Sequence, residues 1–413
     1  MLDIKEIRAN AAAIEAKLKT KDPSISLKKL LELDEALRHL KTETDQLKTK
    51  RNDISSRIGT LKREQQDTSA LMKDAGSLLE EIHQRDEKLK TLEHDFLREI
   101  EKLPNIPMDD IHISQDPKDN VVVKEWGKRR LFNFPFKNHL ELNEKLKLFD
   151  FERAAKTSGT GWPAYRGLGA QLERALINYM LETHIKNGYT MWMPPILVRT
   201  ETLYGSGQLP KFEHQQFKLG DDDFPLWLIP TAEVSLNGLH QNEIIKEDDL
   251  PLRYVAYTPC FRREAGAAGK QERGLIRMHQ FNKVEMFVFA HPQESMEIFQ
   301  SMLKSAESIL QGLGIHYRET LLVTGDMSFG SARTIDVEVW LPGQDRYYEV
   351  SSISNCTDYQ ARRSNIHTLN GSGLATSRLM VALLENNQNE DGSVTIPEVL
   401  RHAMGGLSVL SPS

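Results

Sequence analysis

The sequence predicts an α+β protein in which an N-terminal antiparallel helical hairpin precedes a domain built on an antiparallel β-sheet flanked by helices. Three observations support this fold class. Apolar residues repeat with heptad spacing over residues 33–103, strand-like segments follow beyond residue 110, and those strands are grouped rather than alternating strictly with helices. A chain of 413 residues can hold two or three domains. We therefore expect one domain over residues 1–110 and another over residues 111–413.

Composition and charge narrow the class of protein. Lys and Arg number 53 against 59 Asp and Glu, a net charge of −6, so any nucleic-acid contact must be local. The two cysteines, Cys260 and Cys356, are too few for a disulfide framework or a cysteine-rich zinc site. The acidic start and the lack of an uncharged apolar run of about 18 residues argue against a secretory signal and a membrane span. We expect a cytoplasmic protein without membrane contact.

The first part of the chain carries a heptad seam in two runs, with charged residues on the other faces. The apolar seam residues are Leu33, Leu37, Leu40, Leu47, Ile54, Ile58 and Leu61 in the first run and Leu78, Ile82, Leu89, Leu92, Phe96, Ile100 and Leu103 in the second. Polar residues 64–70 separate the runs and predict the turn between two helices, each about 45–50 Å long. Thr44, Arg51 and Arg85 interrupt the seam and fix its register.

Positive charge is concentrated on the distal half of the first long helix. Residues 41–63 contain seven basic and three acidic side chains, a net charge of +4, whereas residues 1–100 contain 20 of each sign. A basic rod suits the phosphate backbone of a nucleic acid, which it would contact without reading sequence. The alternative is a solvated face of a coiled coil, and charge alone favours that alternative.

The pattern becomes mixed beyond the hairpin. Residues 104–107 and 115–120 are typical of a linker. Strand-like segments follow at 226–229, 284–289, 334–340 and 347–350, and helical segments at Gly169–Lys186, Ser295–Gly312 and Leu374–Asn387. Ile335, Val337 and Val339 alternate with acidic residues, which is the period of a half-buried antiparallel strand.

The common nucleotide-binding and catalytic motifs are absent from the sequence. Residues 266–270 resemble the end of a P-loop, but Gln271 stands where Ser or Thr is required. Residues 371–373 open a predicted helix as a dinucleotide fingerprint does, but Thr376 replaces its third glycine. No zinc-protease or serine-hydrolase signature occurs. Any nucleotide site must therefore be of another kind.

Arginines and carboxylates at strand and helix junctions remain as candidates, without a nucleophile. Arg262 precedes a Gly/Ala-rich loop, Glu349 and Ser352 end a predicted strand, and Arg378 lies in the first turns of a predicted helix. Hard oxygen ligands suit Mg²⁺, and arginine clamps with Mg²⁺ are what phosphoryl chemistry needs. Taken singly, each residue is better explained as part of a structural ion pair. Their recurrence favours a phosphoryl-transfer site.

Four short motifs, in order along the chain, carry a resemblance to a known family. They are Gly188-Tyr189 with Pro194-Pro195, Pro230-Thr231-Ala232-Glu233, Phe261-Arg262-Arg263-Glu264 with Phe281 and Glu285, and Gly371-Ser372-Gly373 through Arg378. With the hairpin, they resemble the bacterial type of seryl-tRNA synthetase, within the class II aminoacyl-tRNA synthetases, over nearly the whole chain. The resemblance implies a tRNA-binding helical arm over 1–110 and a class II catalytic and dimerisation domain over 111–413.

The resemblance also implies an ATP-dependent serine–tRNA ligase. It would join L-serine to tRNA(Ser), and to tRNA(Sec), through seryl-adenylate, with release of AMP and pyrophosphate. The implied catalytic residues are Arg262, Glu349 and Arg378. The implied ATP-binding residues are Arg262, Arg263, Glu264, Met278, His279, Gln280, Phe281, Glu349, Val350, Ser351, Ser352 and Arg378. The implied serine-binding residues are Thr231, Ala232, Glu233, Arg262, Glu285 and Ser372, and the implied Mg²⁺ ligands are Glu349 and Ser352, with no zinc expected.

The same resemblance assigns roles outside the catalytic site. The arm would read the shape of the long variable arm of the tRNA. The arm residues expected to contact tRNA are Lys48, Lys50, Arg51 and Arg57. Pro195 would pack at the interface of a homodimer, and the arm would act across the two subunits.

The chain departs from the family pattern at a few positions. Ile353 stands where the family usually has Cys, Cys356 occupies a usually bulky position, and Trp192 replaces a common Val. The segment 361–370 is shorter than in many relatives. None of these changes removes a proposed ligand.

Two other functions remain open. A synthetase-like ligase that loads a carrier protein would lack the long hairpin, which is present here. A coiled-coil binding protein with a retired catalytic domain would be expected to lose Arg262, Glu349 or Arg378, and all three are present.

Overall fold

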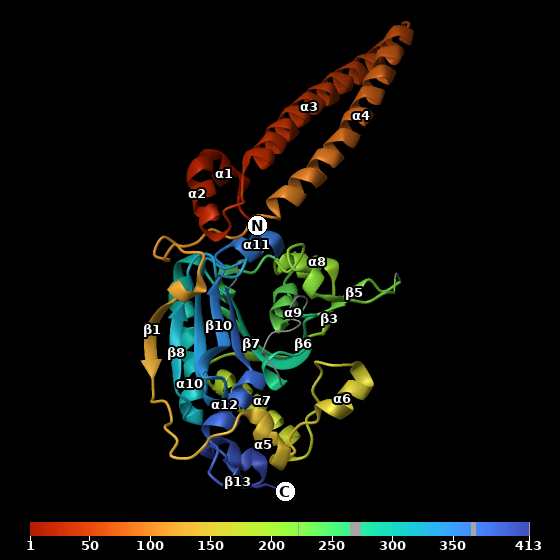
Figure 1. Cartoon of the computed structure of the whole chain (residues 1–413). Helices are drawn as coiled ribbons and strands as arrows, with labels where there is room; N and C mark the ends of the chain where they lie inside the picture. Colours follow the sequence, from red (N-terminus) through yellow and green to blue (C-terminus); the bar gives the residue numbers. More distant parts are fainter. Residues whose placement is uncertain (222, 265–273, 365–368, 413) are drawn as a thin grey trace. The chain divides into compact units, whose positions relative to one another are not determined.

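The chain is described by a computed structural model that covers residues 1–412 except 222, 265–273 and 365–368, with the backbone alone described for 369–373. It contains two compact units, residues 2–103 and residues 104–413, the second together with Met1. The first unit is entirely helical in its regular structure, and the second carries the β-sheets (Figure 1). Within the described residues, no helix is both long and apolar enough to cross a membrane.

The helical unit confirms the predicted hairpin. Two long helices, α3 (Lys28–Arg63) and α4 (Ser69–Ile100), pack along each other, and two short helices that the pattern did not predict, α1 (Ile4–Ala9) and α2 (Ala11–Lys21), precede them. The predicted turn over 64–70 is shorter than expected. The Asp67 carboxylate accepts hydrogen bonds from the backbone and hydroxyl of Ser69, so the second helix begins at that residue.

The polar residues of the seam are satisfied within the hairpin. The buried Thr44 donates its hydroxyl to the carbonyl of Leu40 at 2.7 Å. Arg85 on α4 reaches across to Glu43 on α3, with Nη1 2.5 Å from Oε2, and also bonds Glu81. Of these bonds, the one between Arg85 and Glu43 joins the two helices, so it favours one alignment of the hairpin, whereas the other two lie within a single helix.

An eight-stranded sheet forms the centre of the second unit. Its strand order is β1-β8-β9-β10-β11-β7-β6-β2, and every neighbouring pair is antiparallel except β2–β6. The strands in this order are Val121–Trp126, Tyr317–Leu321, Arg333–Leu341, Arg346–Asn355, Leu369–Ala375, Gln280–Phe289, Leu252–Phe261 and Thr190–Trp192. The four segments predicted as strands are confirmed, three of them in this sheet, which the sequence predicted as wholly antiparallel. The parallel pairing of the edge strand β2 was not foreseen.

Smaller elements complete the unit. A three-stranded sheet contains β3 (Leu197–Arg199), β5 (Leu226–Leu228) and β4 (Phe217–Lys218), and a two-stranded one contains β12 (Val394–Thr395) and β13 (Val409–Leu410). The shorter helices are α5 (His139–Leu146), α6 (Phe151–Ser158), α8 (Thr200–Gly205), α9 (Ala232–Gly238), α11 (Tyr359–Ser364) and α13 (Glu398–Arg401).

One helix start was predicted wrongly. Residues 371–373 were expected to open a helix over Leu374–Asn387, but residues 371–375 belong to β11, whose backbone pairs with β7 on one side and β10 on the other. The helix α12 (Thr376–Asn386) begins only after this strand. The glycines 371 and 373 therefore lie in the middle of a sheet rather than in a turn.

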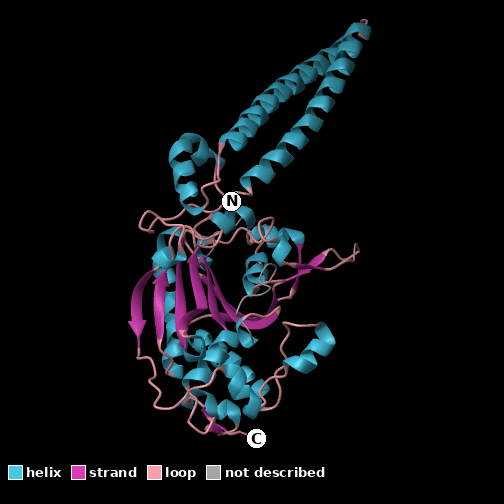
Figure 2. Cartoon of the chain, in the orientation of Figure 1, coloured by secondary structure: helices cyan, strands magenta, loops and turns pink. Residues whose placement is uncertain are grey.

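Alternation along β7 separates the two faces of the sheet. Val284, Met286 and Val288 belong to the main core, which they share with residues of α7 (Leu168–Lys186), α10 (Ser295–Leu313) and α12. Phe287 and Phe289 point to the other face and pack with Ala232 and Leu236 of α9. The helices α7, α10 and α12 lie along one side of the strands in Figure 2. The odd-numbered residues of β7 thus face away from that helical layer.

We expect Gly169→Ala to destabilise this unit. A Cβ at Gly169, in the first turn of α7, would lie 2.0 Å from the carbonyl oxygen of Leu148, which is backbone and cannot turn aside. Overpacking of this kind costs roughly 1–3 kcal/mol or more. Thermal unfolding measured by circular dichroism should show a fall in Tm. Gly59→Ala on α3 is the matched control, because its Cβ would meet nothing within 4 Å; an equal Tm loss in both variants would contradict the contact argument.

Candidate active site

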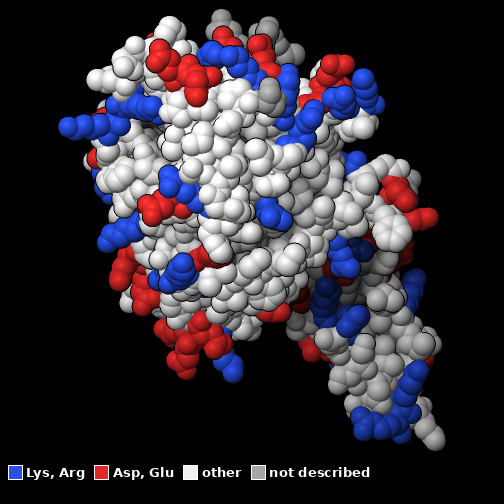
Figure 3. Space-filling model, turned by 90° about the horizontal axis from the view of Figure 1, so that it is seen from below, with Lys and Arg blue, Asp and Glu red and all other residues white. Residues whose placement is uncertain are grey.

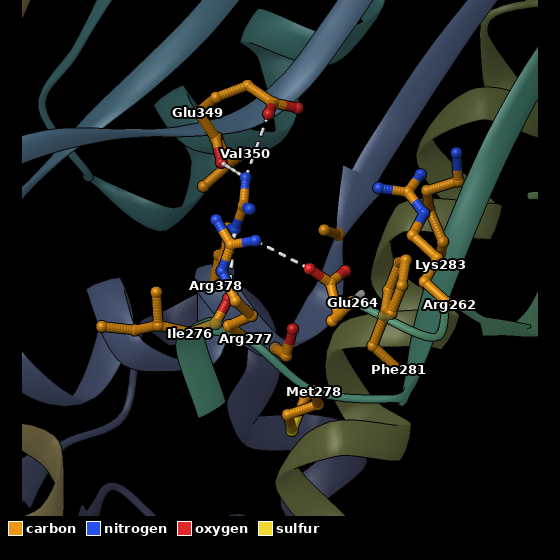
Figure 4. Close-up of a pocket in the computed structure, with 12 residues that line it drawn as sticks. Arg262, Glu264, Ile276, Arg277, Met278, Phe281, Lys283, Glu349, Val350 and Arg378 are labelled. Carbon is orange, nitrogen blue, oxygen red and sulfur yellow. Dashed lines mark hydrogen bonds and ion pairs between the residues drawn. The ribbon is translucent and has the colours of Figure 1, made fainter. Parts of the chain in front are cut away.

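Two adjoining cavities lie at the end of β6 and along β7, and they share Arg262, Lys283 and Glu349. Figure 4 shows the first of them. The predicted site residues that line the first cavity are Arg262, Glu264, Met278, Phe281, Glu349, Val350 and Arg378. Those that line the second are Thr231, Glu233, Arg262, Glu285, Glu349 and Ser352. Residues expected to bind a nucleotide thus gather in one cavity, and residues expected to bind an amino acid gather in the other.

The first cavity combines a cation, a ring and a carboxylate. The backbone N–H of Arg262 donates to the carbonyl of His279 at 2.9 Å, which extends the β6–β7 pairing past the end of β6. The Arg262 guanidinium carbon lies 5.2 Å from the ring centre of Phe281. Glu264 has a positive φ of 48° and pairs with Arg277 at 2.7 Å. A phosphate, a base and an amino group would each find a complementary partner here.

Arg378 and Glu349 neutralise each other at the opposite side of the first cavity. Arg378 Nη1 donates to the carbonyl of Glu349 at 2.8 Å and to its carboxylate Oε2 at 3.0 Å (Figure 4). Both side chains are partly exposed. The pair joins the start of α12 to β10, so the two residues expected to meet the phosphates already hold each other in place.

A β-bulge brings Glu349 and Ser352 to the same cavity. Side chains three residues apart normally point to opposite faces of a strand, but the register of β10 against β9 shifts between Glu349 and Ser351. Both Glu349 and Ser352 consequently line the second cavity. Without the extra residue, one of these oxygen donors would face the core.

Asp336 lies directly opposite Ser352 and supports its hydroxyl. The two residues are paired in register between β9 and β10, and the Asp336 carboxylate accepts a hydrogen bond from the Ser352 side chain. Burial, and then the neighbouring Glu349 carboxylate, raise the pKa of the Asp336 carboxyl well above its usual range. Among the residues that the structure describes, Oδ1 of Asp336 has no hydrogen-bond partner.

The oxygen donors of this corner fit a magnesium ion. Mg²⁺ in proteins takes one or two carboxylates and completes its shell with waters and substrate phosphates. Glu349 and Ser352 offer that limited set beside the first cavity, with the Asp336 carboxylate behind them. No cluster of three or more His, Cys, Asp or Glu suited to a metal occurs in the described part of the chain. The donor set therefore suits an ion that arrives with phosphates.

The second cavity is lined by buried acceptors around Thr231. Thr231 caps the N-terminus of α9, and its Oγ1 accepts from the backbone N–H of Glu233 at 3.2 Å. The same hydroxyl lies 3.3 Å from Oε2 of Glu285. The Glu233 carboxylate accepts from Nε2 of Gln360 at 2.5 Å, which fixes its orientation. Oxygens from α9 and β7 thus converge on one small volume.

Some predicted nucleotide-binding residues do not reach the first cavity. Arg263 is exposed, and its backbone N–H donates to Gln215. The His279 ring packs near Trp162 and Phe217 instead, with ring centres 5.5 and 6.4 Å apart. The remaining predicted residues outside the two cavities are Gln280, which is exposed, and Ala232 and Ser351, which are fully buried. The Ser372 side chain lies outside the described residues, although its backbone pairs with Glu285.

The predicted tRNA-binding residues lie on α3 and differ in their availability. Lys50 and Arg57 are exposed. Lys48 pairs with Asp86 on α4 at 2.9 Å, and Arg51 donates to Asn52 at 2.6 Å. Positive and negative side chains are mixed around a wide uncharged area on the face shown in Figure 3.

The predicted interface residue lies beside an apolar edge of the sheet. Pro195 is exposed, and its carbonyl accepts from the Ser235 hydroxyl at 2.6 Å. Three consecutive large apolar side chains next to it, Met191, Trp192 and Met193, are 42, 38 and 84% exposed. Such a cluster on an edge strand is typical of a surface that another chain covers.

Comparisons with known proteins match both units. Residues 1–107 match the family model of the seryl-tRNA synthetase N-terminal domain, and residues 216–387 match that of the class II tRNA synthetase core domain for Gly, His, Pro, Ser and Thr. A serine–tRNA ligase of Chlamydia abortus is 50% identical over 424 residues and covers 100% of both chains; one of Chlamydia trachomatis is 48% identical with 100 and 99% coverage. The chain belongs to the seryl-tRNA synthetases.

Solved structures of seryl-tRNA synthetases share the fold. The enzyme of Pyrococcus horikoshii, in complex with ATP, has a TM-score of 0.92 and 36% identity and covers 100% of both chains. The cytoplasmic enzyme of Naegleria fowleri, in complex with AMP, has a TM-score of 0.88 and 27% identity over 100% of this chain and 99% of that one. The predicted α+β class and class II synthetase family are thereby confirmed.

Three residues at this seryl-tRNA synthetase site were not predicted from the sequence: Lys283, Asp336 and Gln360. Lys283 lies two residues before Glu285, so the strand period places both on one face, and that signal was available. Asp336 was noted only as a member of an alternating strand, and Gln360 meets Glu233 across 127 residues of sequence. Spacing along the chain carries no signal for such distant pairs.

A buried carboxyl joins the synthetase motifs behind the cavities. Glu173 on α7 accepts from the Asn282 side chain of β7 at 3.0 Å and from the Thr376 hydroxyl at the start of α12. Its Oε2 has no hydrogen-bond partner within the described residues. Burial raises the pKa of the Glu173 carboxyl, although these two hydrogen bonds oppose the shift.

We expect Glu173→Gln to stabilise the protein increasingly as the pH rises. The folded-state pKa of Glu173 lies above its ordinary value of 4.5, so the folded state holds the proton more tightly than the unfolded chain does. The wild type therefore loses stability as the pH rises above about 4.5, until the folded pKa is passed. The Gln variant lacks this loss. The Tm difference between the two proteins, measured from pH 4.5 to 8, should grow; a constant difference would contradict the assignment.

Proposed function

We propose that this chain joins L-serine to tRNA(Ser) in two steps through seryl-adenylate. The observation that carries the proposal is the pair of adjoining cavities that share Arg262 and Glu349. One presents arginines and an aromatic ring, which suit a nucleotide, and the other presents buried acceptors, which suit a small hydroxylated amino acid. The family membership supports the same pairing of substrates.

Arg262 is the residue proposed to stabilise the first step. The serine carboxylate attacks the α-phosphorus of ATP, the bond to pyrophosphate breaks, and seryl-adenylate forms. No general base is needed, because a carboxylate is ionised at neutral pH. Arg262 borders both cavities, so it can neutralise the charge that grows on the α-phosphate during attack. In the second step, the 3′-terminal hydroxyl of tRNA takes the seryl group and AMP leaves.

The other residues of the first cavity are proposed to orient ATP. Phe281 would stack on the adenine base and Glu264 would accept from its amino group. Arg378 would bind the γ-phosphate, which requires that it leave Glu349. Glu349 and Ser352 would then hold Mg²⁺, which supplies further neutralisation of phosphate charge.

The second cavity is proposed to select serine through buried acceptors. Thr231 and Glu233 would receive the ammonium group, Glu285 would add another acceptor, and Ser372 would lie near the substrate hydroxyl. Alanine lacks the hydroxyl and would leave the polar group that meets it unpaired, and sites built to bind a hydroxyl reject the analogue without it by about 10⁴-fold. Threonine would be excluded only by the room for one methyl group, which is worth about 10–200-fold.

The remaining proposals concern assembly and tRNA. We propose a homodimer whose interface includes Pro195, supported by the exposed apolar side chains beside it. Residues 1–110 are proposed as the tRNA-binding arm and residues 111–413 as the catalytic domain, with the arm of one subunit serving the site of the other. The same chain would serylate tRNA(Sec), since recognition through tRNA shape does not require an anticodon.

Amino-acid-dependent ATP–pyrophosphate exchange without tRNA tests the first step. We expect exchange with serine, a 10–200-fold lower kcat/KM with threonine, and no measurable exchange with alanine or glycine. Exchange with a different amino acid would overturn the roles proposed for Thr231, Glu285 and Ser372. The lack of exchange with any amino acid would favour the retired-enzyme alternative.

Arg378→Ala is the matched variant for the same assay. We expect it to abolish serine-dependent exchange and to leave the oligomeric state unchanged, because the side chain bonds only within the cavity among the contacts described. Size-exclusion chromatography with light scattering checks the second point. Serine-dependent exchange at the wild-type rate would contradict the role proposed for Arg378.

Charge reversal on the arm tests the tRNA contact. We expect the double variant Lys50→Glu and Arg57→Glu to raise the KM for tRNA by tenfold or more and to weaken its salt dependence, while serine-dependent exchange stays at the wild-type rate. Lys73→Glu with Lys88→Glu, two exposed lysines of α4, is the matched control. Equal losses of charging in both double variants would contradict a specific role for α3.

A further inference from the structure

Lys283 places a buried ammonium group inside the second cavity. Its side chain is 6% exposed, and Nζ lies 2.7 Å from Thr231 Oγ1. The same ammonium forms an ion pair with Oε2 of Glu285. Lys283 and Glu285 are two residues apart on β7, and they share the face that carries Phe287 and Phe289. An ion pair thus stands where the strand otherwise presents apolar side chains.

The partners of this ammonium are the ones proposed for the ammonium of the substrate. Thr231 and Glu285 are both buried, at 3 and 2% exposure, and a carboxylate in such a position requires a cation. In the free chain Lys283 supplies it. An amino acid that brings its own ammonium to these oxygens must therefore share them with Lys283 or displace it.

Lys283 also faces the nucleotide side. It borders both cavities, as Arg262 and Glu349 do. In Figure 4 Lys283 and Arg262 lie on the side of the first cavity opposite the Arg378–Glu349 pair. Because both cations border both cavities, an anion placed between the cavities would be attracted by Lys283 and by Arg262. The α-phosphate of ATP would bring such an anion to this place.

We propose that Lys283 couples the binding of serine to the binding of ATP, an inference that rests on the function proposed above. When the substrate ammonium takes its place at Thr231 and Glu285, it repels the Lys283 ammonium, which turns toward the first cavity. There it adds a second cation next to Arg262 and strengthens the attraction for the α-phosphate. By linkage, bound ATP favours the same position of Lys283 and tightens serine binding by the same factor.

Calorimetric titration of α,β-methylene-ATP with Mg²⁺, in the absence and presence of saturating serine, tests the coupling. This analogue cannot release pyrophosphate, so serine remains unreacted. In the wild type we expect serine to lower the Kd of the analogue about tenfold. In Lys283→Met and Lys283→Gln, which remove the charge, we expect the factor to fall below about two. The Gln variant retains a hydrogen-bond donor for Glu285 and covers the case in which the Met variant does not fold.

Lys124→Met is the matched control. This lysine also bridges two carboxylates, Glu307 and Glu319, but on the edge strand β1 rather than at the cavities. It should keep the wild-type coupling factor. Independent binding of serine and the analogue in the wild type, or wild-type coupling in a folded Lys283 variant, would overturn the proposal. Failure of the coupling can be told apart from failure of the proposed function, because only the latter would abolish serine-dependent exchange in the wild type.

Discussion

The two-residue period of β7 is the constraint on which the rest of this structure depends. Val284, Met286 and Val288 enter the core shared with α7, α10 and α12, whereas the odd-numbered residues face α9 and the cavities. A single strand therefore carries both the packing that stabilises the domain and the side chains Phe281, Lys283 and Glu285 that line the site. A shift of one residue in register would turn the Lys283–Glu285 ion pair into the apolar core and turn the core residues of β7 toward the cavities.

Register shifts in the neighbouring strands β10 and β11 direct functional side chains toward the cavities. The bulge of β10 turns Glu349 and Ser352 toward one cavity, and a second register shift lies in β11 between Ser372 and Leu374. Both sit next to the cavities, where bulges are commonly used to re-aim side chains. The rigid pairing on either side of each bulge holds these residues in position without a ligand.

The sequence was sufficient to predict the hairpin, four of the strands and many of the residues that line the two cavities. Heptad spacing and alternation are local signals, so α3, α4, β7 and β9 could be predicted from them. The start of α12 was misplaced because Gly371 and Gly373 suggest a turn, whereas the pairing with β7 and β10 that decides their conformation is not local. Gln360 and Asp336 were missed for the same reason, since their partners are distant in the chain or on another strand.

The ion pair between Arg378 and Glu349 would also affect which anions can bind in the first cavity. Cells contain many small anions, and a bare arginine in an open cavity would attract them. An orthophosphate ion that bound Arg378 would leave the Glu349 carboxylate without a cationic partner. Replacing Glu349 by orthophosphate at Arg378 would therefore gain little free energy. A nucleotide that arrives with its divalent ion offers a partner to both residues at once. Under the proposed function, the Arg378–Glu349 pair would therefore favour a nucleotide bound to its divalent ion over a small free anion.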